Sequence, residues 1–478
     1  MPSITPGLLV SDSQTFVSTR GQAPPSGFAE VLLAGLAPDG GLYVPAAWPV
    51  FSAAQIAAFA GQPYSHVAYE ILSRFAGAAF SAEDLKADIA DAYAGFEAPD
   101  IAPLSKLEQP GSNGSQYLLE LFHGPTFAFK DIALQILGRL FARALAQRGG
   151  KATIVAATSG DTGSAAIAAL GGLPNIDVFV MHPRGRVSEV QRRQMTTSGH
   201  ANVHNIALDG SFDDAQGIVK GLFAQTEFAR DVGLTAVNSI NFVRIAAQSV
   251  YYFTAATALQ RPATFVVPTG NFGDIFAGEA AMRMGLAAER LVIATNANDI
   301  MARALNTGVY EAGAAHHTLS PSMDIQVASN FERALFEASG RDSDWTRAAM
   351  NDFARARRLE LPAGVLAQLR ARYSAFACND DDTLATIKAV HAASGRVIDP
   401  HTAVAVSAAG KIAASAAPLV ILSTAHAAKF PDAVKQAIGR NPDMPAPLQR
   451  VMNLPEKLEN LPNDPALIRQ FISSRLAG

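Results

Sequence analysis

The sequence predicts an α/β protein with two open, mainly parallel sheets flanked by helices, preceded by an N-terminal cap. From about residue 151 onward, short apolar runs alternate with helical runs, and glycine-rich turns follow several of the apolar runs. Strands that are apolar on both faces are typical of parallel sheets covered by helices on both sides. The chain has 478 residues and is 49 % hydrophobic, which is enough for two or three domain cores.

The expected elements follow one another in the order that such sheets require. The predicted strands are residues 151–157, 177–181, 202–208, 264–268, 291–295 and 418–423. The predicted helices are one that begins near Gly163 and those at 187–197, 212–228 and 242–259, with a mainly helical stretch at 330–393.

Composition along the chain predicts where the domains divide. Proline and glycine interrupt the first hundred residues, which are therefore assigned to a separate cap. The larger α/β domain is predicted from residues 101–150 and 260–435, and the smaller one from 151–259. Residues 436–478 are rich in proline, and we expect them to wrap over the surface.

The overall charge excludes some classes of partner. The chain has 38 basic and 42 acidic residues and a net charge of −4, so it has no electrostatic drive toward nucleic acid or anionic membranes. It contains no uninterrupted apolar run of about 18 residues, so no membrane span is expected. No obligate protein partner is evident, and a monomer is weakly preferred.

The cysteine content and the start of the chain indicate a cytoplasmic protein. Cys378 is the only cysteine, which excludes an intramolecular disulfide and fits a reducing compartment. The first residues, MPSITPGLLVSD, do not have the cationic and apolar regions of a signal peptide. No zinc motif of the His-Glu-x-x-His type occurs, and no metal site is predicted.

The first segment that can carry chemistry is LFHGPTFAFKDIALQ at residues 121–135. Lys130 lies at the start of a predicted helix, among Phe127, Phe129 and Ile132, where its amine is poorly placed to reach water. Desolvation lowers the pKa of a lysine, as a Schiff-base lysine requires. The alternative is a structural lysine that extends its amine to solvent, although a cation at a helix N-terminus is electrostatically unfavourable.

Two glycine-containing loops connect a predicted strand to a predicted helix. ATSGDTGS at 157–164 and VPTGNFGD at 267–274 both stand where ligands bind in open α/β sheets. Small residues let backbone amides approach an anion, and the helix N-terminus favours negative charge. The first loop alone could equally be an ordinary turn, with Asp161 or Thr162 capping its helix, and for the second loop alone an ordinary turn is favoured.

A fourth segment, ILSTAHAAKF at 421–430, ends a predicted strand with a pair of hydroxyl groups followed by His426. In isolation, a capped helix start explains this pattern better than a binding site does.

Taken together, these motifs resemble those of threonine synthases. The resemblance rests on HGPTFAFKD at 123–131, TSGDTGS at 158–164 and PTGNFGD at 268–274. It extends to STRG at 18–21, HPRGRVS at 182–188, QRRQMTT at 191–197, NSIN at 238–241 and SMDIQVASNFER at 322–333. It covers the chain from about residue 15 to the proline-rich tail and is closest to the longer family members with an N-terminal cap. Ala427 departs from the pattern, in which proline follows the histidine, and this bears on loop rigidity.

The resemblance implies a fold-type II pyridoxal-phosphate enzyme, similar to the tryptophan synthase β subunit. It makes Lys130 the catalytic lysine that carries the cofactor as a Schiff base. It assigns the cofactor phosphate to the loop of Gly270, Asn271, Phe272, Gly273 and Asp274, and the pyridine nitrogen to Thr424.

The same resemblance implies O-phospho-L-homoserine as the substrate, converted with water to L-threonine and phosphate by γ-elimination and β-addition. The loop of Ser159, Gly160, Asp161 and Thr162 is then expected to face the substrate carboxylate. The substrate phosphate needs a cationic clamp, for which an arginine fork is suited. The candidates for binding it are Arg186 and Arg244 with Asn241, and also Arg192, Arg193, Ser322 and Asn330.

Besides a catalytically inactive paralogue, which the intact lysine and loops disfavour, two alternatives stay open at this point. Another fold-type II lyase, acting on O-phosphothreonine, threonine or serine, would share the lysine and the phosphate loop. A regulatory protein that binds nucleotides or anions through glycine-rich loops would bind no chromophore and would tolerate loss of Lys130.

Overall fold

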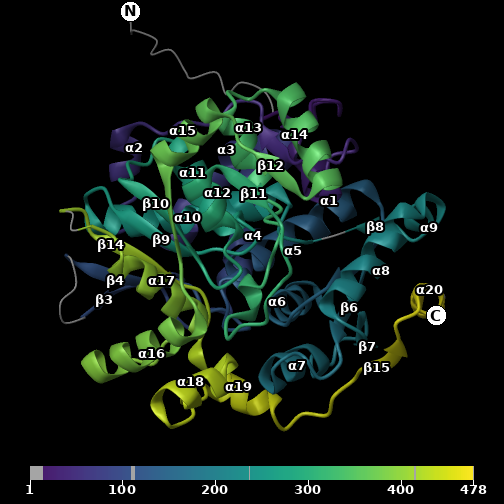
Figure 1. The fold of residues 1–478 in the computed structure, drawn as a ribbon. Helices are drawn as coiled ribbons and strands as arrows, with labels where there is room; N and C mark the ends of the chain where they lie inside the picture. The colour runs from purple at the N-terminus through teal and green to yellow at the C-terminus, as the bar shows by residue number, and fades with distance from the viewer. Residues whose placement is uncertain (1–13, 109–113, 236, 414–415, 477–478) are drawn as a thin grey trace, which may run out of the picture.

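The computed structural model describes residues 14–108, 114–235, 237–413 and 416–476. The chain folds into two sheets that lie side by side, each covered by helices, with the N-terminal segment packed against the side of the larger sheet (Figure 1).

The N-terminal cap consists of short helices around a two-stranded antiparallel ribbon. The ribbon is formed by β1 (Phe16–Ser18) and β2 (Tyr43–Pro45). The helices are α1 (Phe28–Ala34), α2 (Ala53–Ala57), α3 (Tyr64–Ala76), η1 (Gly77–Ala79) and α4 (Ala82–Tyr93). Buried residues recur on α3 at Val67, Ile71 and Phe75, which is the spacing of one helix face.

The larger sheet has six strands in the part of the chain that the structure describes, in the order β13-β10-β9-β14-β4-β3. All neighbouring strands are parallel except β3 and β4. The strands are β3 (Leu104–Leu107), β4 (Gln116–Glu120), β9 (Thr264–Pro268), β10 (Arg290–Thr295), β13 (Tyr373–Ala377) and β14 (Leu419–Ser423). Every residue of β9 and β14 is buried, as expected for central strands covered on both faces.

The smaller sheet has five described strands, all parallel, in the order β15-β7-β6-β5-β8. They are β5 (Ala152–Ala157), β6 (Ile176–Pro183), β7 (Val203–Asp209), β8 (Leu234–Thr235) and β15 (Glu459–Pro462). Its helices are α6 (Asp161–Leu170), α7 (Glu189–Thr196), α8 (Phe212–Ala224) and α9 (Thr226–Asp231).

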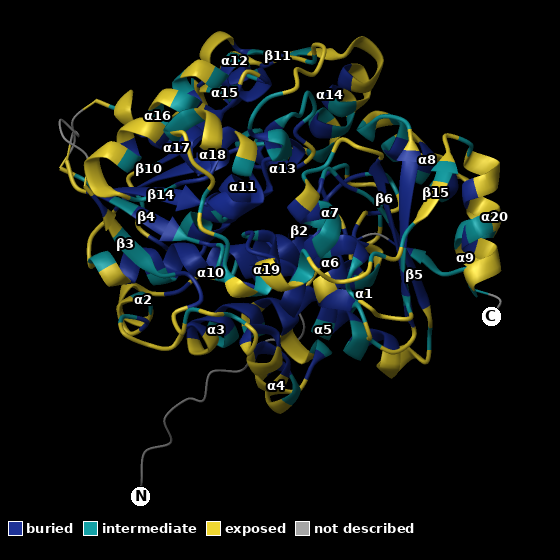
Figure 2. Ribbon diagram, turned by 90° about the horizontal axis from the view of Figure 1, so that it is seen from below, coloured by how far each residue is buried: buried dark blue, intermediate teal, exposed yellow. Residues whose placement is uncertain are grey.

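Two long buried helices, α5 (Lys130–Arg148) and α10 (Phe242–Leu259), join these parts. Helix α10 packs against α5, against α3 of the cap and against α11 (Gly273–Arg283). One continuous cluster of buried side chains runs from the cap through these helices to both sheets. Figure 2 shows the buried residues in the sheets and central helices, with exposed residues at the periphery.

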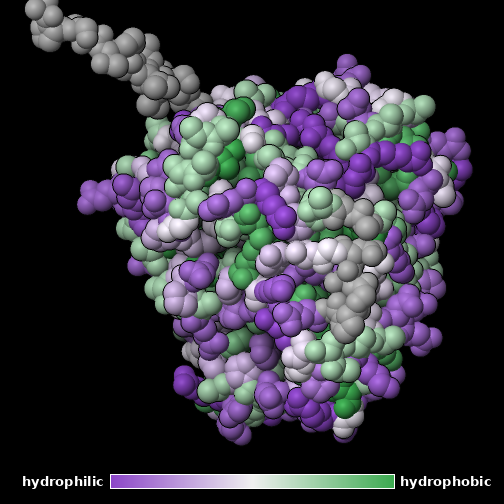
Figure 3. Space-filling view, turned by 90° about the vertical axis from the view of Figure 1, so that its left-hand side faces the viewer, coloured by the Kyte–Doolittle hydropathy of each residue, from purple (hydrophilic) through white to green (hydrophobic). Residues whose placement is uncertain are grey.

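The remaining elements either pack around the larger sheet or form the end of the chain. They are α12 (Ile300–Thr307), β11 (Val309–Glu311), η2 (Pro321–Met323), α13 (Phe331–Ala338), α14 (Ser343–Ala356), β12 (Arg358–Glu360), α15 (Ala363–Arg372), α16 (Asp380–Ser394), α17 (Pro400–Gly410), η3 (Ala427–Lys429), α18 (Pro431–Ile438), α19 (Ala446–Val451) and α20 (Pro465–Leu476). On the face seen in Figure 3, hydrophilic residues predominate and hydrophobic ones form small separate groups. No described helix combines the length and the apolar character that a membrane span needs.

The cap is attached to α13 by polar contacts as well as by the packing of buried apolar side chains. Arg20 forms an ion pair with Glu332 at 2.9 Å, and the Trp48 indole donates to Glu337 at 2.9 Å. The fully buried Arg333 donates to the carbonyl oxygen of Tyr43 at 2.9 Å. These contacts fix α13 and the loop before it, which contributes to the site described below.

Both predicted sheets are present and mainly parallel, and most predicted elements lie within two residues of their expected bounds. The helix expected at 212–228 is divided into α8 and α9 at Gln225. Among the strands of these two sheets, β3, β4, β8, β13 and β15 were not predicted. The C-terminal segment does more than wrap the surface, because β15 extends the smaller sheet beside β7 and α20 packs against α8.

We expect Phe242→Ala to lower the free energy of unfolding by about 3–5 kcal/mol, because it removes a fully buried ring between the cap and α10. The Phe242 ring lies 5.1 Å from that of Phe16 and 5.3 Å from that of Phe75, centroid to centroid. Urea denaturation measures the change. Leu467→Ala, at a position 43 % exposed on α20, is the control and is expected to change stability by about 0.5 kcal/mol or less. Equal losses in the two variants would contradict this packing.

Candidate active site

The candidate site lies where loops that follow the strands of the two sheets meet the start of α5. The loop 158–160 follows β5 and leads into α6, and the loop 269–272 follows β9 and leads into α11. The segment 424–426 follows β14 and pairs with the segment before α5: Phe129 N donates to Thr424 O at 2.8 Å, and His426 N donates to Phe127 O at 3.1 Å. This pairing brings two parts of the sequence that are far apart, 127–129 and 424–426, to one place.

Lys130 is the first residue of α5 and its side chain is buried among other residues. It is 8 % exposed, its Nζ lies 4.6 Å from the centre of the Phe129 ring, and its nearest carboxylate is Asp161 at 3.5 Å. Burial lowers the pKa of the Lys130 amine below its ordinary value, and the charges of Lys429 and Arg244 add to this lowering, whereas Asp161 opposes it. The amine is therefore easier to deprotonate than an ordinary surface lysine.

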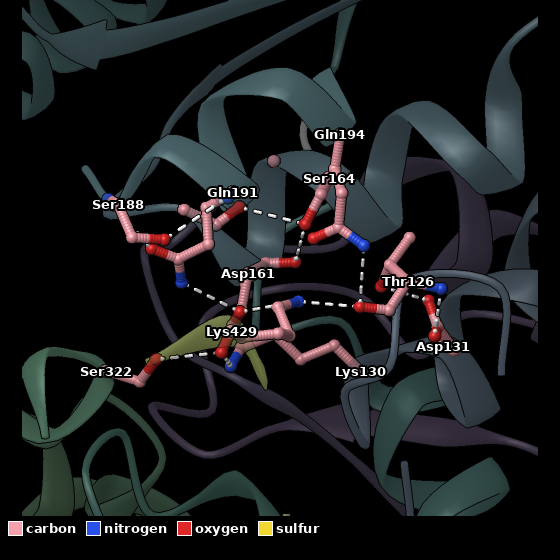
Figure 4. A network of polar contacts seen from close by, with 12 residues as sticks. Thr126, Lys130, Asp131, Asp161, Ser164, Ser188, Gln191, Gln194, Ser322 and Lys429 are labelled. Atoms are coloured by element: carbon pink, nitrogen blue, oxygen red, sulfur yellow. Dashed lines mark hydrogen bonds and ion pairs between the residues drawn. The ribbon is translucent and has the colours of Figure 1, made fainter. Parts of the chain in front are cut away.

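Asp161 is the centre of the polar network around Lys130 (Figure 4). Its Oδ1 lies 2.8 Å from Lys429 Nζ and accepts a hydrogen bond from Gln191 Nε2 at 2.9 Å. Its Oδ2 accepts from Ser322 Oγ at 3.2 Å and faces Lys130. Burial alone would raise the pKa of this carboxyl, but the two lysines outweigh it and hold the pKa well below its usual range.

The loop before α6 has the local structure of an anion site. Thr158 Oγ1 accepts from Gly160 N at 2.9 Å and from Gly163 N at 2.8 Å, which fixes the turn. Gly160 has φ 135°, and a Cβ there would lie 2.4 Å from Gln191 Cδ, so this position requires glycine. The amides of Asp161 and Thr162, the first two residues of α6, have no carbonyl within the helix to bond and can face a ligand. Ser159 and Thr162 are partly exposed on this loop.

The loop before α11 is formed by Gly270, Asn271 and Phe272 and is held from behind by the segment around Ser322 and Asn330. A Cβ on Gly270 would lie 2.9 Å from Ser322 O, and the Asn271 carbonyl accepts from both Asn330 N and Asn330 Nδ2 at 3.0 Å. Phe272 has φ 64°, a left-handed conformation that turns the chain into α11 at Gly273.

Asp274, in the first turn of α11, has one oxygen that is satisfied and one that is not. Its Oδ1 accepts from the hydroxyl groups of Tyr251 and Tyr252. Its Oδ2 is buried and has no hydrogen-bond partner among the described residues. Burial raises the pKa of Asp274 to about 6, against the effect of the two tyrosine hydroxyl groups and of Lys130.

Thr424 follows β14 directly and is 5 % exposed. The hydrogen bond from Phe129 to its carbonyl oxygen fixes it beside the residue that precedes Lys130. Thr424 and Lys130 therefore belong to one local arrangement, and a contact of Thr424 with the pyridine nitrogen stays a prediction.

Arg244 is a buried cation without a counter-ion among the described residues. It is 3 % exposed, its Nη1 donates to Val237 O at 3.4 Å, and its buried Nε has no partner among those residues. Burial lowers the pKa of Arg244 to about 10. A buried guanidinium with free donors is suited to bind an anion.

The other predicted substrate residues differ in what surrounds them. Arg186 is exposed in the loop after β6. Asn241 is fully buried, caps α10 by accepting from Val243 N at 3.0 Å, and donates to Leu32 O at 2.8 Å. Arg192 forms a two-pronged ion pair with Glu456 near the C-terminus. Roles of Arg186 and Asn241 in substrate binding stay predictions, and for Asn241 such a role would require one of these contacts to be exchanged.

Two groups at the site were not predicted as site residues. The first is Lys429, which is fully buried beside Asp161, and the sequence feature that could have indicated it is a lysine within the apolar run at 427–430.

The second is His401, which is buried with Nδ1 2.8 Å from Asp399 Oδ1, and its Nε2 accepts from Ser322 N at 3.2 Å. Its signal was the Asp-Pro-His-Thr run at the start of α17. His401 thus holds the Ser322 segment that contacts Asp161.

Three family models match the chain. They are described as threonine synthase N terminus for residues 15–93, pyridoxal-phosphate dependent enzyme for residues 100–368, and threonine synthase, C-terminal, for residues 402–472. The second matches more than half of the chain. The fold and the site therefore define a pyridoxal-phosphate-dependent enzyme of fold type II.

Comparison with individual proteins gives the family. The threonine synthase of Pseudomonas aeruginosa is 47 % identical over 463 residues, which cover 96 % of this chain and 98 % of that protein. The crystal structure of threonine synthase from Brucella melitensis with pyridoxal phosphate bound has a TM-score of 0.93 at 49 % identity, covering 97 % of this chain and 99 % of that one. That of threonine synthase from yeast has a TM-score of 0.92 at 35 % identity, with the same coverage. The chain belongs to the threonine synthase family.

The residues present fit pyridoxal phosphate. A buried amine of lowered pKa is available at Lys130, and a helix N-terminus follows a loop whose Gly270 leaves no room for a side chain. The amides at the start of that helix can donate to the cofactor phosphate. The buried Nε of Arg244, which has no partner among the described residues, belongs to a positive charge that acts on Lys130.

We expect Asp274→Asn to gain stability relative to the unchanged protein as the pH rises. The pKa of Asp274 is raised from 3.8 to about 6, so the folded protein binds its proton more tightly and the carboxyl costs stability once it ionises. That cost is absent below pH 3.8, grows between pH 3.8 and about 6, and is complete above about 6. The variant has no such cost and can still accept from both tyrosines.

Thermal unfolding of the two cofactor-free proteins at pH 5 and pH 7 tests this. The difference in Tm, variant minus unchanged protein, is expected to be larger at about pH 7 than at about pH 5. A difference that does not depend on pH would contradict the assignment.

Proposed function

We propose that this protein converts O-phospho-L-homoserine and water to L-threonine and phosphate, with Lys130 as the residue that binds the cofactor covalently. The observation that carries the proposal is the buried Lys130 amine, of lowered pKa, close to the starts of α6 and α11. The relatives of nearly full length are named threonine synthases, which supports this choice among the reactions of pyridoxal-phosphate enzymes.

The cofactor supplies an electron sink for the negative charge that develops on the substrate when protons leave carbon. The protein supplies position and proton transfer. When the substrate amine takes the place of Lys130, the freed lysine amine becomes the base nearest to the substrate Cα. We propose that it removes one proton from Cα and one from Cβ as phosphate leaves Cγ, and that it delivers a proton to Cγ. After the hydroxyl of water has added at Cβ, a proton returns to Cα, and the remaining proton of the water balances the released phosphate. The lowered pKa of Lys130 supports its roles in binding the cofactor covalently and in removing protons, because an amine of ordinary pKa would hold its proton at neutral pH.

We propose separate places for the two anionic ends of the substrate. The α-carboxylate binds to the loop of Ser159, Gly160, Asp161 and Thr162, where the amides at the start of α6 are available. The leaving phosphate binds to arginine, and Arg244 is the better supported candidate because it is buried and lacks a counter-ion among the described residues. Arg186 is the second candidate and Asn241 the third.

For the cofactor, we propose that the loop Gly270–Asp274 binds the phosphate through its amides and that Thr424 meets the pyridine nitrogen. A neutral hydroxyl at that nitrogen would not protonate it as an aspartate would. The division into the domain ranges 101–150 with 260–435, and 151–259, remains a proposal, as does a cytoplasmic location.

The first test is Lys130→Ala. We expect no covalent adduct with pyridoxal phosphate and no detectable threonine or phosphate, because the other buried amine at the site, Lys429, is held by Asp161 and by the Thr126 carbonyl oxygen. Absorbance of the adduct and a joint assay of phosphate and threonine measure this. Lys435→Ala, at an exposed position on α18, is the matched control and should retain both signals. Turnover by Lys130→Ala would contradict the proposal, and release of phosphate with a 2-oxo acid by the unchanged protein would indicate an eliminating lyase instead.

The second test is Arg244→Met. We expect kcat/KM for O-phospho-L-homoserine to fall roughly tenfold to a hundredfold, because hydrogen bonds to charged groups contribute about 1.5–3 kcal/mol. Arg186→Met is the comparison, and its exposed position predicts a smaller loss. Thermal unfolding shows whether each variant is folded. An unchanged kcat/KM in folded Arg244→Met would remove Arg244 from the site.

A further inference from the structure

Two buried lysines share a single carboxylate at the site, and only one of them is proposed to react. Lys429 Nζ lies 2.8 Å from Asp161 Oδ1, whereas Lys130 Nζ lies 3.5 Å from Asp161 Oδ2. Figure 4 shows both amines pointing toward this carboxylate from different elements, α5 and η3. The shorter contact, and therefore the stronger attraction, belongs to Lys429.

Lys429 is held in place by more than the ion pair. Its side chain is fully buried, and its Nζ also donates to the carbonyl oxygen of Thr126 at 2.7 Å. The backbone of η3 is fixed by the hydrogen bond from Lys429 N to His426 O at 3.1 Å. The amine therefore has defined partners and does not need to move in order to stay paired.

The charges around the pair come from several elements. Asp161 lies on α6 and Asp131 is next to Lys130 on α5, and the pKa of Asp131 is raised to about 6 by burial. The other titratable groups whose charges act on Lys130, Asp161 or Lys429 are Arg244 on α10, Asp274 on α11, His401 on α17 and His426 before η3. Among these, Asp161 is the carboxylate in contact with both lysines.

We propose that Lys429 is a positioning residue that binds the Asp161 carboxylate more closely than Lys130 does, so that the ion pair of Lys130 is weakened and its amine can react with the cofactor. The proposal rests on the proposed role of Lys130. Lys429 itself forms no bond with the cofactor or the substrate in this account. It acts through Asp161 and through its own positive charge near Lys130.

The physical reason is a competition for one anion. If Lys429 were neutral, Asp161 would become the counter-ion of Lys130 alone and would stabilise its ammonium form. The repulsion between the two ammonium groups would be lost at the same time, which acts in the same direction. Both changes raise the pKa of Lys130, so less of the free amine would be present at neutral pH and attack on an aldehyde would be slower.

The experiment measures the pH dependence of covalent adduct formation between the cofactor-free, full-length protein and pyridoxal phosphate. The rate is followed by the absorbance of the adduct in the unchanged protein and in Lys429→Met, Lys429→Gln and Lys429→Arg. We expect the midpoint of the rate–pH profile to move up by about one pH unit in the Met and Gln variants, which is about a tenfold slower rate at neutral pH. Lys429→Arg keeps the charge and is expected to keep the midpoint within a few tenths of a unit.

The double variant Lys429→Met with Asp161→Asn separates this role from a structural one. Because the unpaired carboxylate is also removed, its midpoint is expected to return toward that of the unchanged protein. Reduced folding alone would lower the amount of adduct but would leave the midpoint where it was. If Lys429→Met does not fold, Lys429→Gln provides the same test, because glutamine removes the charge but keeps a polar side chain.

An unchanged midpoint in folded Lys429→Met or Lys429→Gln would overturn the inference, as would an equal shift in Lys429→Arg. Neither result would affect the proposed function, provided that the unchanged protein forms the adduct and makes threonine. If the unchanged protein forms no adduct at Lys130, the proposed role of Lys130 fails and the inference fails with it.

Discussion

The ion cluster of Asp161, Lys130 and Lys429 is the constraint on which the site depends. All three side chains are buried, and a buried charge is costly unless it is paired and hydrogen-bonded. The cluster meets this condition only when α6 of the smaller sheet, the start of α5 and the segment after β14 are all in place. Correct assembly of three distant parts of the chain is therefore coupled to the ionisation of Lys130.

Several other features support this arrangement. The pairing of 424–426 with the residues before α5 delivers Lys429 and Thr424 to the site together. Ser322, held by His401, reaches Asp161 from the larger domain's side, and the cap fixes the neighbouring α13 through Arg20 and Trp48. The positive charges at the site exceed the negative ones: Asp161 is the one close carboxylate, and it does not offset both Arg244 and Lys130. Such a site is suited to a cofactor and a substrate that both carry phosphate.

How far the sequence predicted this site depends on whether a feature is local. Helix α10 and strand β9 have the bounds predicted for them, because their apolar runs and the turns around them are local signals. The Lys130 segment and both glycine loops were also found from local patterns, together with a family resemblance. Strand β15 was not predicted, because a short segment that contains proline resembles a surface loop until its partner strand β7 is known.

Lys429 shows what a sequence cannot supply without the fold. Its segment was read for its hydroxyl pair and His426, and a lysine after two alanines has the same local pattern as a helix start. Its significance arises from Asp161, which lies far away in the sequence and next to it in space. For the same reason Arg244 could be named as a candidate, but its burial and lack of a counter-ion among the described residues became visible only in three dimensions.

The central claim, that Lys130 and not Lys429 carries the cofactor, has one direct test. The protein with its cofactor is treated with borohydride, which fixes the lysine–cofactor bond by reduction, and then digested and mapped by mass spectrometry. The account predicts the pyridoxyl-phosphate modification on the peptide that contains Lys130, with the Lys429 peptide unmodified. Modification of Lys429, or of any lysine other than Lys130, would contradict it.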